Sequence, residues 1–371
     1  MCWFYSVFRF FSLIILSTSV NATTLPVDKI ELPPGFTISV YSSEVPGARS
    51  LKLGKNGVVF VSTRGQGHIY ALLPNQDLTK AKQVKVIASN LELPNGIAYK
   101  DGSLYVAEVS RILRFDNVDD LSTISKPEII RDDLPNETHH GWRYIDIGPD
   151  NQLYIAIGIP CNVCLPEGDD RFATISRMSL EGKSMEVFAR GVRNSVGFSW
   201  HPESDTLWFT DNGRDWMGDD LPPDELNHAP KAGLHFGFPY VHGDDIEDPE
   251  FFDQAPKDLQ FIKPVQNLGP HVASLGMRFY TGNQFPADYK HQIFIAEHGS
   301  WNRSKKIGYQ VSLVTIDDNH KATSYKPFAT GWMENEAVWG RPVDVLVMPD
   351  GALLVSDDHA GAVYRISYDA D

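Results

Sequence analysis

The chain has 371 residues, a length that allows one large domain or two ordinary ones. It carries 48 acidic and 33 basic side chains and therefore has a formal net charge of −15 at neutral pH. An acidic protein repels phosphate groups, which argues against nucleic acid as a partner and against docking to anionic lipid.

The first 22 residues resemble a secretory signal peptide. Arg9 is their only charged residue, a largely apolar run over residues 10–16 follows it, and small or tolerated residues at 20–22 end the segment. The run is short for a membrane span. We therefore predict a signal peptide over residues 1–22, no stable membrane insertion after its removal, and a periplasmic or secreted protein. The alternative is an uncleaved N-terminal anchor.

From residue 57 onward one pattern recurs six times: a turn, an alternating apolar segment, and a second apolar segment a few residues later. The first segments are residues 57–61, 102–106, 152–156, 206–210, 292–296 and 352–356. The second segments are residues 68–71, 112–115, 175–178, 224–227, 309–313 and 362–366. Alternating Val, Ile, Tyr and Phe indicate half-buried strands, and Pro, Asp, Asn and Gly introduce several copies.

Repeated multi-strand units predict a propeller, because one blade cannot bury both of its faces alone. No linker-like stretch interrupts the repeats. We therefore predict an all-β fold: residues 23–371 form a single six-bladed β-propeller of four-stranded antiparallel blades. A large β-sandwich is the rival fold, but it does not require six matched hairpins. The spacing widens over residues 213–264, and such an insertion usually lies on one face and carries the site.

Two cysteines of the predicted mature chain, Cys161 and Cys164, form a C-x-x-C motif. In an exported protein a short-loop disulfide is the leading interpretation. A redox-active pair is the alternative, although no thioredoxin-like context surrounds it. Leu165 follows the second cysteine where c-type haem attachment requires His, and no second pair of zinc ligands is evident.

Four segments are unusually polar for the edges of blades: residues 139–143, 191–197, 211–227 and 297–303, with residues 340–344 as a fifth candidate. Each lies near the start or end of a strand pair, and equivalent ends of propeller blades converge on the central channel. A histidine can accept a proton near neutral pH, and arginines can grip carboxylates. Loops rich in carboxylates suit calcium. The alternative is that these residues only tie blades together or form solvated loops.

Taken together, these segments resemble the pyrroloquinoline quinone (PQQ)-dependent glucose/sorbosone dehydrogenase family, particularly its sorbosone dehydrogenase-like branch. The resemblance covers residues 140–154, 191–239, 271–309 and 341–366, and the order Arg-Asn, Asp-Glu-Leu-Asn, His-Gly-Ser-Trp-Asn-Arg is a specific combination. It implies oxidation of a sugar or sugar aldehyde by hydride transfer to PQQ, with calcium as second cofactor. Electrons would pass to a periplasmic or membrane acceptor.

The resemblance also implies roles for the residues that would hold the quinone. His140 matches the general base that takes the proton of the substrate hydroxyl. Arg193 and Asn194 match the pair beside the quinone carbonyl, where Arg193 would stabilise the developing oxyanion. Arg341 matches an arginine that binds a cofactor carboxylate. Either Asn302 or Arg303 stands where a lysine often does similar work.

For calcium, the resemblance implies backbone carbonyls of Gly213 and Arg214 as ligands, supported by the acidic pair Asp224 and Glu225. Arg214 departs from the family pattern, since a proline is usual there, and Val343 stands where the glucose dehydrogenases have a second arginine. Two other functions remain open. A calcium-dependent six-bladed lactonase would leave the arginines of the motifs without a task, and a non-catalytic binding propeller would be expected to lose them.

Overall fold

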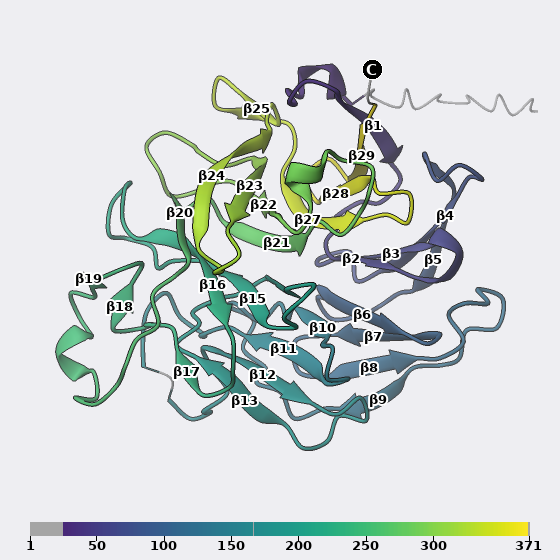
Figure 1. Cartoon of the computed structure of the whole chain (residues 1–371). Helices are drawn as coiled ribbons and strands as arrows, with labels where there is room; N and C mark the ends of the chain where they lie inside the picture. The colour runs from purple at the N-terminus through teal and green to yellow at the C-terminus, as the bar shows by residue number, and fades with distance from the viewer. Residues whose placement is uncertain (1–24, 166, 370–371) are drawn as a thin grey trace, which may run out of the picture.

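The computed structural model describes residues 25–165 and 167–369, and the predicted signal peptide lies outside them. Strands form six main sheets around a common centre (Figure 1). The predicted all-β, six-bladed propeller is confirmed. The described helical segments are single 3-10 turns at Val27–Lys29, Lys55–Gly57, Phe252–Gln254 and Ala287–Tyr289.

Each blade runs from an innermost to an outermost strand. Blade 1 contains β2 (Leu51–Leu53), β3 (Val59–Ser62), β4 (Ile69–Pro74) and β5 (Ala81–Ala88). Blade 2 contains β6 (Gly96–Lys100), β7 (Ser103–Ala107), β8 (Ile112–Phe115) and β9 (Glu128–Arg131). Blade 3 contains β10 (Ile145–Ile147), β11 (Leu153–Ile157), β12 (Thr174–Met178), β13 (Glu186–Arg190) and β17 (Leu234–His235).

The second half of the chain completes the ring. Blade 4 contains β14 (Gly197–Trp200), β15 (Leu207–Asp211), β16 (Pro223–Ala229) and β20 (Gln266–Pro270). Blade 5 contains β21 (Ser274–Phe279), β22 (Ile293–Glu297), β23 (Gln310–Ile316) and β24 (Ala322–Ala329). Blade 6 contains β27 (Pro342–Val347), β28 (Leu353–Asp357), β29 (Ala362–Tyr368) and β1 (Phe36–Ser42). Two small hairpins stand apart: β18 (Val241–His242) with β19 (Ile246–Glu247), and β25 (Met333–Glu334) with β26 (Ala337–Val338).

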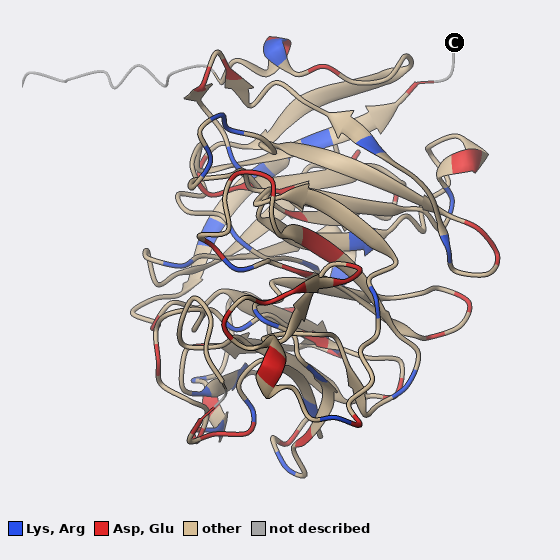
Figure 2. Ribbon diagram, turned by 90° about the vertical axis from the view of Figure 1, so that its left-hand side faces the viewer, with Lys and Arg blue, Asp and Glu red and all other residues tan. Residues whose placement is uncertain are grey.

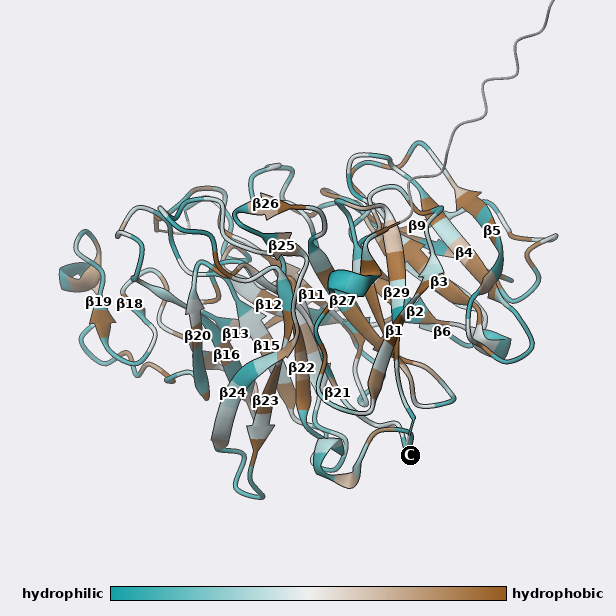
Figure 3. Ribbon diagram, turned by 90° about the horizontal axis from the view of Figure 1, so that it is seen from above, coloured by the Kyte–Doolittle hydropathy of each residue, from teal (hydrophilic) through white to brown (hydrophobic). Residues whose placement is uncertain are grey.

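Each sequence repeat corresponds to the second and third strands of one blade. These strands lie in the middle of their sheet and pack against neighbouring blades on both faces, so their residues are almost continuously apolar. All five residues of β11, for example, are buried. The outermost strands are more polar, and the two leading residues of β9 are exposed. Figure 3 shows this distribution, with hydrophobic residues along the strands and hydrophilic ones along the loops.

The ring is closed by the N-terminal strand. β1 pairs antiparallel with β29, from Phe36 opposite Tyr368 to Ser42 opposite Val363, and so becomes the outer strand of the last blade. Phe36 also packs edge-on against Phe285 and Phe328, with ring centroids 4.8 and 5.0 Å apart. Burying an aromatic ring between two blades makes closure favourable by about 2 kcal/mol or more.

Blade 3 departs from the predicted four antiparallel strands. A fifth strand, β17, pairs parallel with β13 and comes from the long excursion between the third and fourth strands of blade 4, β16 and β20. The same excursion carries the β18–β19 hairpin at the edge of the molecule (Figures 1 and 3). The excursion is therefore attached to blade 3 by strand pairing as well as to blade 4 by the chain itself.

The disulfide predicted between Cys161 and Cys164 is present. It closes a short loop between β11 and β12. Among the described residues, no helix is long and apolar enough to cross a membrane. Acidic and basic residues are interspersed over the face seen in Figure 2.

Candidate active site

A cavity of about 350 Å³ opens where loops from blades 1, 3, 4, 5 and 6 meet. Two kinds of loop line it: those that lead into an innermost strand and those that join the second strand of a blade to the third. Of the predicted site residues it brings together His140, Arg193, Asn194, Gly213, Asp224, Asn302 and Arg341. These residues span more than half of the chain, and the circular arrangement of the blades brings them together.

His140 is held at the cavity wall as a neutral base. Its Nδ1 lies 2.8 Å from the carbonyl oxygen of Ile159, which can only accept a hydrogen bond. Nδ1 therefore carries the proton, and Nε2 keeps a free lone pair. Burial, with help from the positive charge of Arg193 and from His139, lowers the pKa of His140 to about 2, so the ring stays neutral.

Arg193 is fixed by neighbours on two loops, the one between β11 and β12 and the one between β15 and β16. Its Nε and Nη2 donate to the backbone and side-chain oxygens of Asn162, at 2.8 and 3.0 Å, and Nη1 donates to the carbonyl of Asn212 at 3.1 Å. Asp215 lies 3.6 Å away. Burial lowers the pKa of Arg193 in spite of that carboxylate. The positive charge of the Arg193 guanidinium therefore lies beside the cavity and is only partly compensated by Asp215.

The backbone that carries Arg193 is positioned by a buried carboxylate. The amides of Arg193 and Asn194 donate to the two oxygens of Asp211 at 2.7 and 2.6 Å. Burial raises the pKa of Asp211 to about 7. Asp211 ends β15, so it ties the loop before blade 4 to the second strand of that blade and fixes where Arg193 and the Asn194 amide enter the cavity.

Two further arginines face the cavity without a carboxylate partner. Arg341 donates from Nε and Nη2 to the carbonyls of His298 and Gly299, at 2.9 Å each. Arg64 lies 4.1 Å above the ring of Trp142. Among the described residues, no carboxylate oxygen lies within 4.0 Å of either guanidinium. Burial lowers the pKa of both arginines. The cavity is thus locally cationic although the protein is acidic.

Comparisons with known proteins place this chain in a family. A model of the family described as Glucose / Sorbosone dehydrogenase matches residues 56–365. The chain therefore belongs to the glucose/sorbosone dehydrogenase family. An uncharacterized protein from Borreliella burgdorferi is 36% identical over 380 residues, which cover 97% of each chain. A PQQ-dependent pyranose dehydrogenase from Coprinopsis cinerea is 32% identical over 124 residues, which cover 28% of this chain and 16% of that protein.

Solved structures with the same fold include several sugar dehydrogenases. The PQQ domain of the Coprinopsis cinerea pyranose dehydrogenase, in its holo form, has a TM-score of 0.75 at 19% identity and covers 91% of this chain and 97% of its own. The PQQ-bound aldose sugar dehydrogenase of Streptomyces coelicolor has a TM-score of 0.63 at 18% identity and covers 91% and 100%. At such identities the likeness shows a shared fold.

Of the calcium residues predicted for this glucose/sorbosone dehydrogenase family member, Gly213 and Asp224 line the cavity. Asp224 accepts hydrogen bonds from the amides of Gly213 and Ser274, at 3.0 and 2.9 Å. Glu225 lies behind the cavity and accepts from the amide of Gly243 at 2.7 Å. Burial raises the pKa of Asp224 to about 6 and that of Glu225 to about 8. Nearby positive charge would stabilise both carboxylates.

Arg214 does not line the cavity with its side chain. Its guanidinium turns into the excursion and pairs with Asp248 and Glu250, at 2.6 and 2.8 Å. The side chain therefore anchors the excursion, and only the backbone of Arg214 remains for the predicted calcium role. Within the parts of the chain that the structure describes, no group of three or more His, Cys, Asp or Glu side chains is arranged to hold a metal by itself.

Asn302 and Arg303 are placed differently from each other. Asn302 lines the cavity and donates from Nδ2 to Asp215 at 2.6 Å. Arg303 is absent from the cavity lining and donates to the carbonyl of Asp219, with Asp220 3.4 Å away. Arg303 therefore joins two loops, whereas Asn302 can present its oxygen to a bound group.

Sequence reasoning missed several cavity residues. Arg49 and Asp358 form a buried ion pair of 2.9 Å, and the same carboxylate accepts from His298 at 2.8 Å. Arg49 and Arg64 lie outside the stretches that carried the resemblance, whereas Trp142, His298 and Asp358 lie within them. Position in the repeat was the available signal, because Arg49 precedes the innermost strand of blade 1 as Arg341 precedes that of blade 6.

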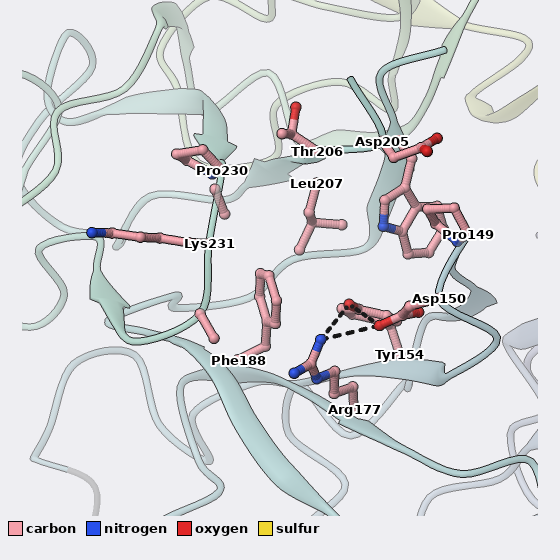
Figure 4. A pocket seen from close by; sticks show the side chains of 13 residues that line it. Pro149, Asp150, Tyr154, Arg177, Phe188, Asp205, Thr206, Leu207, Pro230 and Lys231 are labelled. Carbon is pink, nitrogen blue, oxygen red and sulfur yellow. Dashed lines mark hydrogen bonds and ion pairs between the residues drawn. The ribbon is translucent and has the colours of Figure 1, made fainter. Parts of the chain in front are cut away.

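A second cavity, of about 460 Å³, lies at the opposite end of blades 3 and 4 (Figure 4). Two cations line it, Lys231 and Arg177, and Arg177 is neutralised by Asp150 at 3.0 Å and Glu186 at 2.7 Å. Figure 4 shows Arg177 directed at Asp150 and Tyr154. None of the predicted site residues lies there. Although it is the larger of the two cavities, the residues that line it include no histidine and no arginine without a carboxylate partner.

Proposed function

We propose that this protein is a PQQ-dependent sugar dehydrogenase that oxidises a sugar or sugar aldehyde, in the manner of the sorbosone dehydrogenase-like branch of its family. The observation that carries the proposal is one cavity that combines the neutral base His140 with the uncompensated guanidinium groups of Arg64 and Arg341. The relatives named as PQQ-dependent sugar dehydrogenases support an oxidoreductase.

The residues of the cavity suit an anionic cofactor. PQQ is a flat tricarboxylate, and an acidic protein can retain it only where cations are gathered locally. Arg64, Arg193 and Arg341 would bind its carboxylate and carbonyl oxygens, and Asn194 and Asn302 would supply neutral hydrogen bonds. The cofactor, when bound, supplies the two-electron hydride acceptor that no side chain can provide.

The side chains of the chain itself would bind and orient the substrate and move one proton. His140 Nε2 accepts the proton of the substrate hydroxyl, while the Ile159 carbonyl keeps the ring in the required tautomer. Arg193 lies next to the base and stabilises negative charge that develops on oxygen during the reaction. Its hydrogen bonds to Asn162 and Asn212 hold the guanidinium in place before the reaction begins.

We propose calcium as the second cofactor. The carbonyls of Gly213 and Arg214 would bind it, with Asp224 and Glu225 supplying negative charge nearby, and the ion would polarise the quinone. Because the described side chains form no self-sufficient metal cluster, calcium is expected to bind together with PQQ oxygens rather than alone. We also propose export by the N-terminal segment and electron transfer to a periplasmic or membrane acceptor.

The test is calorimetric titration of the EDTA-treated mature protein with PQQ, with and without calcium. We expect binding that strengthens with calcium and weakens at least tenfold in Arg341→Ala, since a charge-assisted hydrogen bond contributes about 1.5–3 kcal/mol. Arg177→Ala, which removes the neutralised cation of the opposite cavity, is the matched control and should bind normally. Dye reduction with aldoses and sugar aldehydes then identifies the substrate.

Two results would contradict the proposal. The first is a folded protein that binds no PQQ in the presence of calcium. The second is PQQ binding that depends equally on Arg177 and Arg341, because adsorption to any cation would then explain it.

A further inference from the structure

Two tryptophans at the rim of the candidate active site are unusually exposed. Trp216 is 71% exposed and Trp301 is 64% exposed, the highest values among the exposed large hydrophobic side chains of the described residues. Their rings meet edge to face, with centroids 5.6 Å apart and planes at 87°. Trp301 also lines the cavity. An apolar patch left in water at the mouth of a cavity is typical of a binding surface.

The two indoles come from loops that are fastened to each other. Trp216 follows Asp215, Trp301 precedes Asn302, and Asn302 donates to Asp215 at 2.6 Å. A second link is the amide of Ser304, which donates to Asp219 at 3.0 Å. These hydrogen bonds hold the two loops together and fix the positions of both indoles, so little conformational entropy remains to be lost when a ligand binds.

Backbone strain at Trp216 supports a binding role. Its φ is 73°, in the left-handed region that is unfavourable for a bulky residue. Such a conformation costs about 1–3 kcal/mol and persists where the surroundings impose it, commonly at binding sites. The strained backbone here holds a large apolar side chain that packs on Trp301 and is otherwise exposed to water.

The size of the cavity limits what can lie inside it. At about 350 Å³ it is at the lower end of small-molecule pockets, so PQQ and one sugar ring would fill it. A second ring attached to the first would have to leave through the rim, where the indoles stand. An indole offers a flat apolar face and an N–H donor, which match the apolar face and hydroxyl edge of a sugar ring.

Other occupants fit this rim less well. Asp215, Asp219 and Asp220 share a loop with Trp216, and Arg303, Lys305 and Lys306 share one with Trp301, so the rim carries no excess of positive charge that would attract an anionic lipid surface. Two side chains are also too small a patch for a stable protein interface, which needs about 1,000 Å². A neutral saccharide meets neither objection.

We propose that Trp216 and Trp301 form a stacking subsite for the second sugar ring of an oligosaccharide or glycoside whose first ring is oxidised in the cavity. This inference rests on the proposed function and extends it, because it assigns the substrate to saccharide chains rather than to single sugars.

The test compares glucose with the disaccharides maltose, cellobiose and lactose. In the PQQ- and calcium-loaded protein, the ratio of kcat/KM for the best disaccharide to that for glucose should fall about 3- to 10-fold in Trp216→Ala. Trp216→Phe should retain most of the ratio. Ile129→Ala, which removes an exposed apolar side chain on the outer strand of blade 2, is the matched control and should not change it.

A second measurement does not depend on the cofactor. Disaccharides should quench the tryptophan fluorescence of the apoprotein, and the quenching should weaken in Trp216→Ala. If apoprotein shows this binding but never binds PQQ, the subsite stands and the proposed function fails. If the loaded enzyme oxidises glucose and disaccharides with a ratio unaffected by Trp216→Ala, the subsite is wrong and the proposed function stands. Slower reduction of a protein acceptor with unchanged disaccharide affinity would overturn the subsite in favour of partner docking.

Discussion

Replacing Asp358 with Asn should destabilise the propeller, because this carboxylate compensates two cationic or polar groups at the cavity wall. It accepts from Arg49 Nη1 at 2.9 Å and from His298 Nε2 at 2.8 Å. Burial alone would raise the pKa of Asp358, but His298 and Arg49 lower it more, so the pKa lies well below the usual range. The carboxylate is therefore charged throughout the physiological pH range.

The expected loss follows from the burial of the partner. The Arg49 side chain is 2% exposed and that of Asp358 is 16% exposed. Removing one member of a buried ion pair costs about 3–5 kcal/mol, because the remaining charge is left uncompensated. Arg49 keeps its hydrogen bond to Asn95, at 2.8 Å, so we expect the lower end, about 3 kcal/mol. At a slope of about 3 kcal/mol per M, the urea midpoint should fall by about 1 M.

The assay is urea unfolding of the mature protein at pH 7, followed by far-UV circular dichroism. Adding Arg49→Met to Asp358→Asn should recover part of the loss, since neither charge then remains buried. The control is Glu334→Gln, which removes a carboxylate from the exposed pair with Lys29 and should leave the midpoint unchanged.

The same variant has a defined pH dependence. The pKa of Asp358 is lower in the folded protein than in the unfolded chain. The ionised carboxylate therefore contributes its full stabilisation above the unfolded pKa of about 3.9, and this stabilisation is lost as pH falls through the folded pKa. The difference in the free energy of unfolding between wild type and Asp358→Asn should be constant from pH 7 to about pH 5 and shrink below about pH 4. An unchanged midpoint at pH 7, or losses that simply add in the double variant, would refute this reasoning.

Three further predictions concern the base, a histidine cluster and the disulfide. His140→Gln should lower kcat by about 10²- to 10⁴-fold while calorimetry still shows PQQ binding, and near-normal turnover would exclude His140 as the base. Burial, then His320 and His201, lowers the pKa of His228 to about 4, so the fold takes up fewer protons than the unfolded chain. Stability should therefore fall as pH drops from about 6.5 towards 4, less so in His228→Asn, as urea midpoints at several pH values would show. Replacing Cys161 and Cys164 with Ser should cost about 2 kcal/mol by the loop-entropy relation and also weaken PQQ binding, because Asn162 in that loop holds Arg193. PQQ affinity unaffected by the loss of the disulfide would show that the loop keeps its shape without it.

The central strands of every blade could be predicted because their signal is local. Residues such as those of β11 and β28 are buried on both faces, and a continuous apolar segment after a turn is visible without any knowledge of the neighbours. The inner and outer strands were less visible because they are short or partly exposed. The disulfide was predictable for the same reason, since three residues of separation bring Cys161 and Cys164 within reach in most loop conformations.

For the site, the sequence indicated which segments carry chemistry but not all of their partners. His140, Arg193 and Arg341 were found by their motifs and lie in one cavity. Arg49 and Arg64 were not found, because no motif surrounds them, and for Arg49 the one available signal was its position before the innermost strand of a blade. Arg49 becomes a cavity residue only through Asp358, its ion-pair partner 309 positions away.

The sequence by itself determined the repeat, the type of strand and the chemistry available at the strand ends, because side-chain alternation and turn residues act over a few positions. Only the tertiary structure decided how the ring closes through β1 and β29, that β17 joins blade 3, and which way the Arg214 side chain points. These outcomes depend on pairing between segments far apart in the chain, whose free energy comes from burying surface between blades. The Trp216–Trp301 pair is likewise decided by the tertiary structure, since the two loops come together only when the blades are assembled.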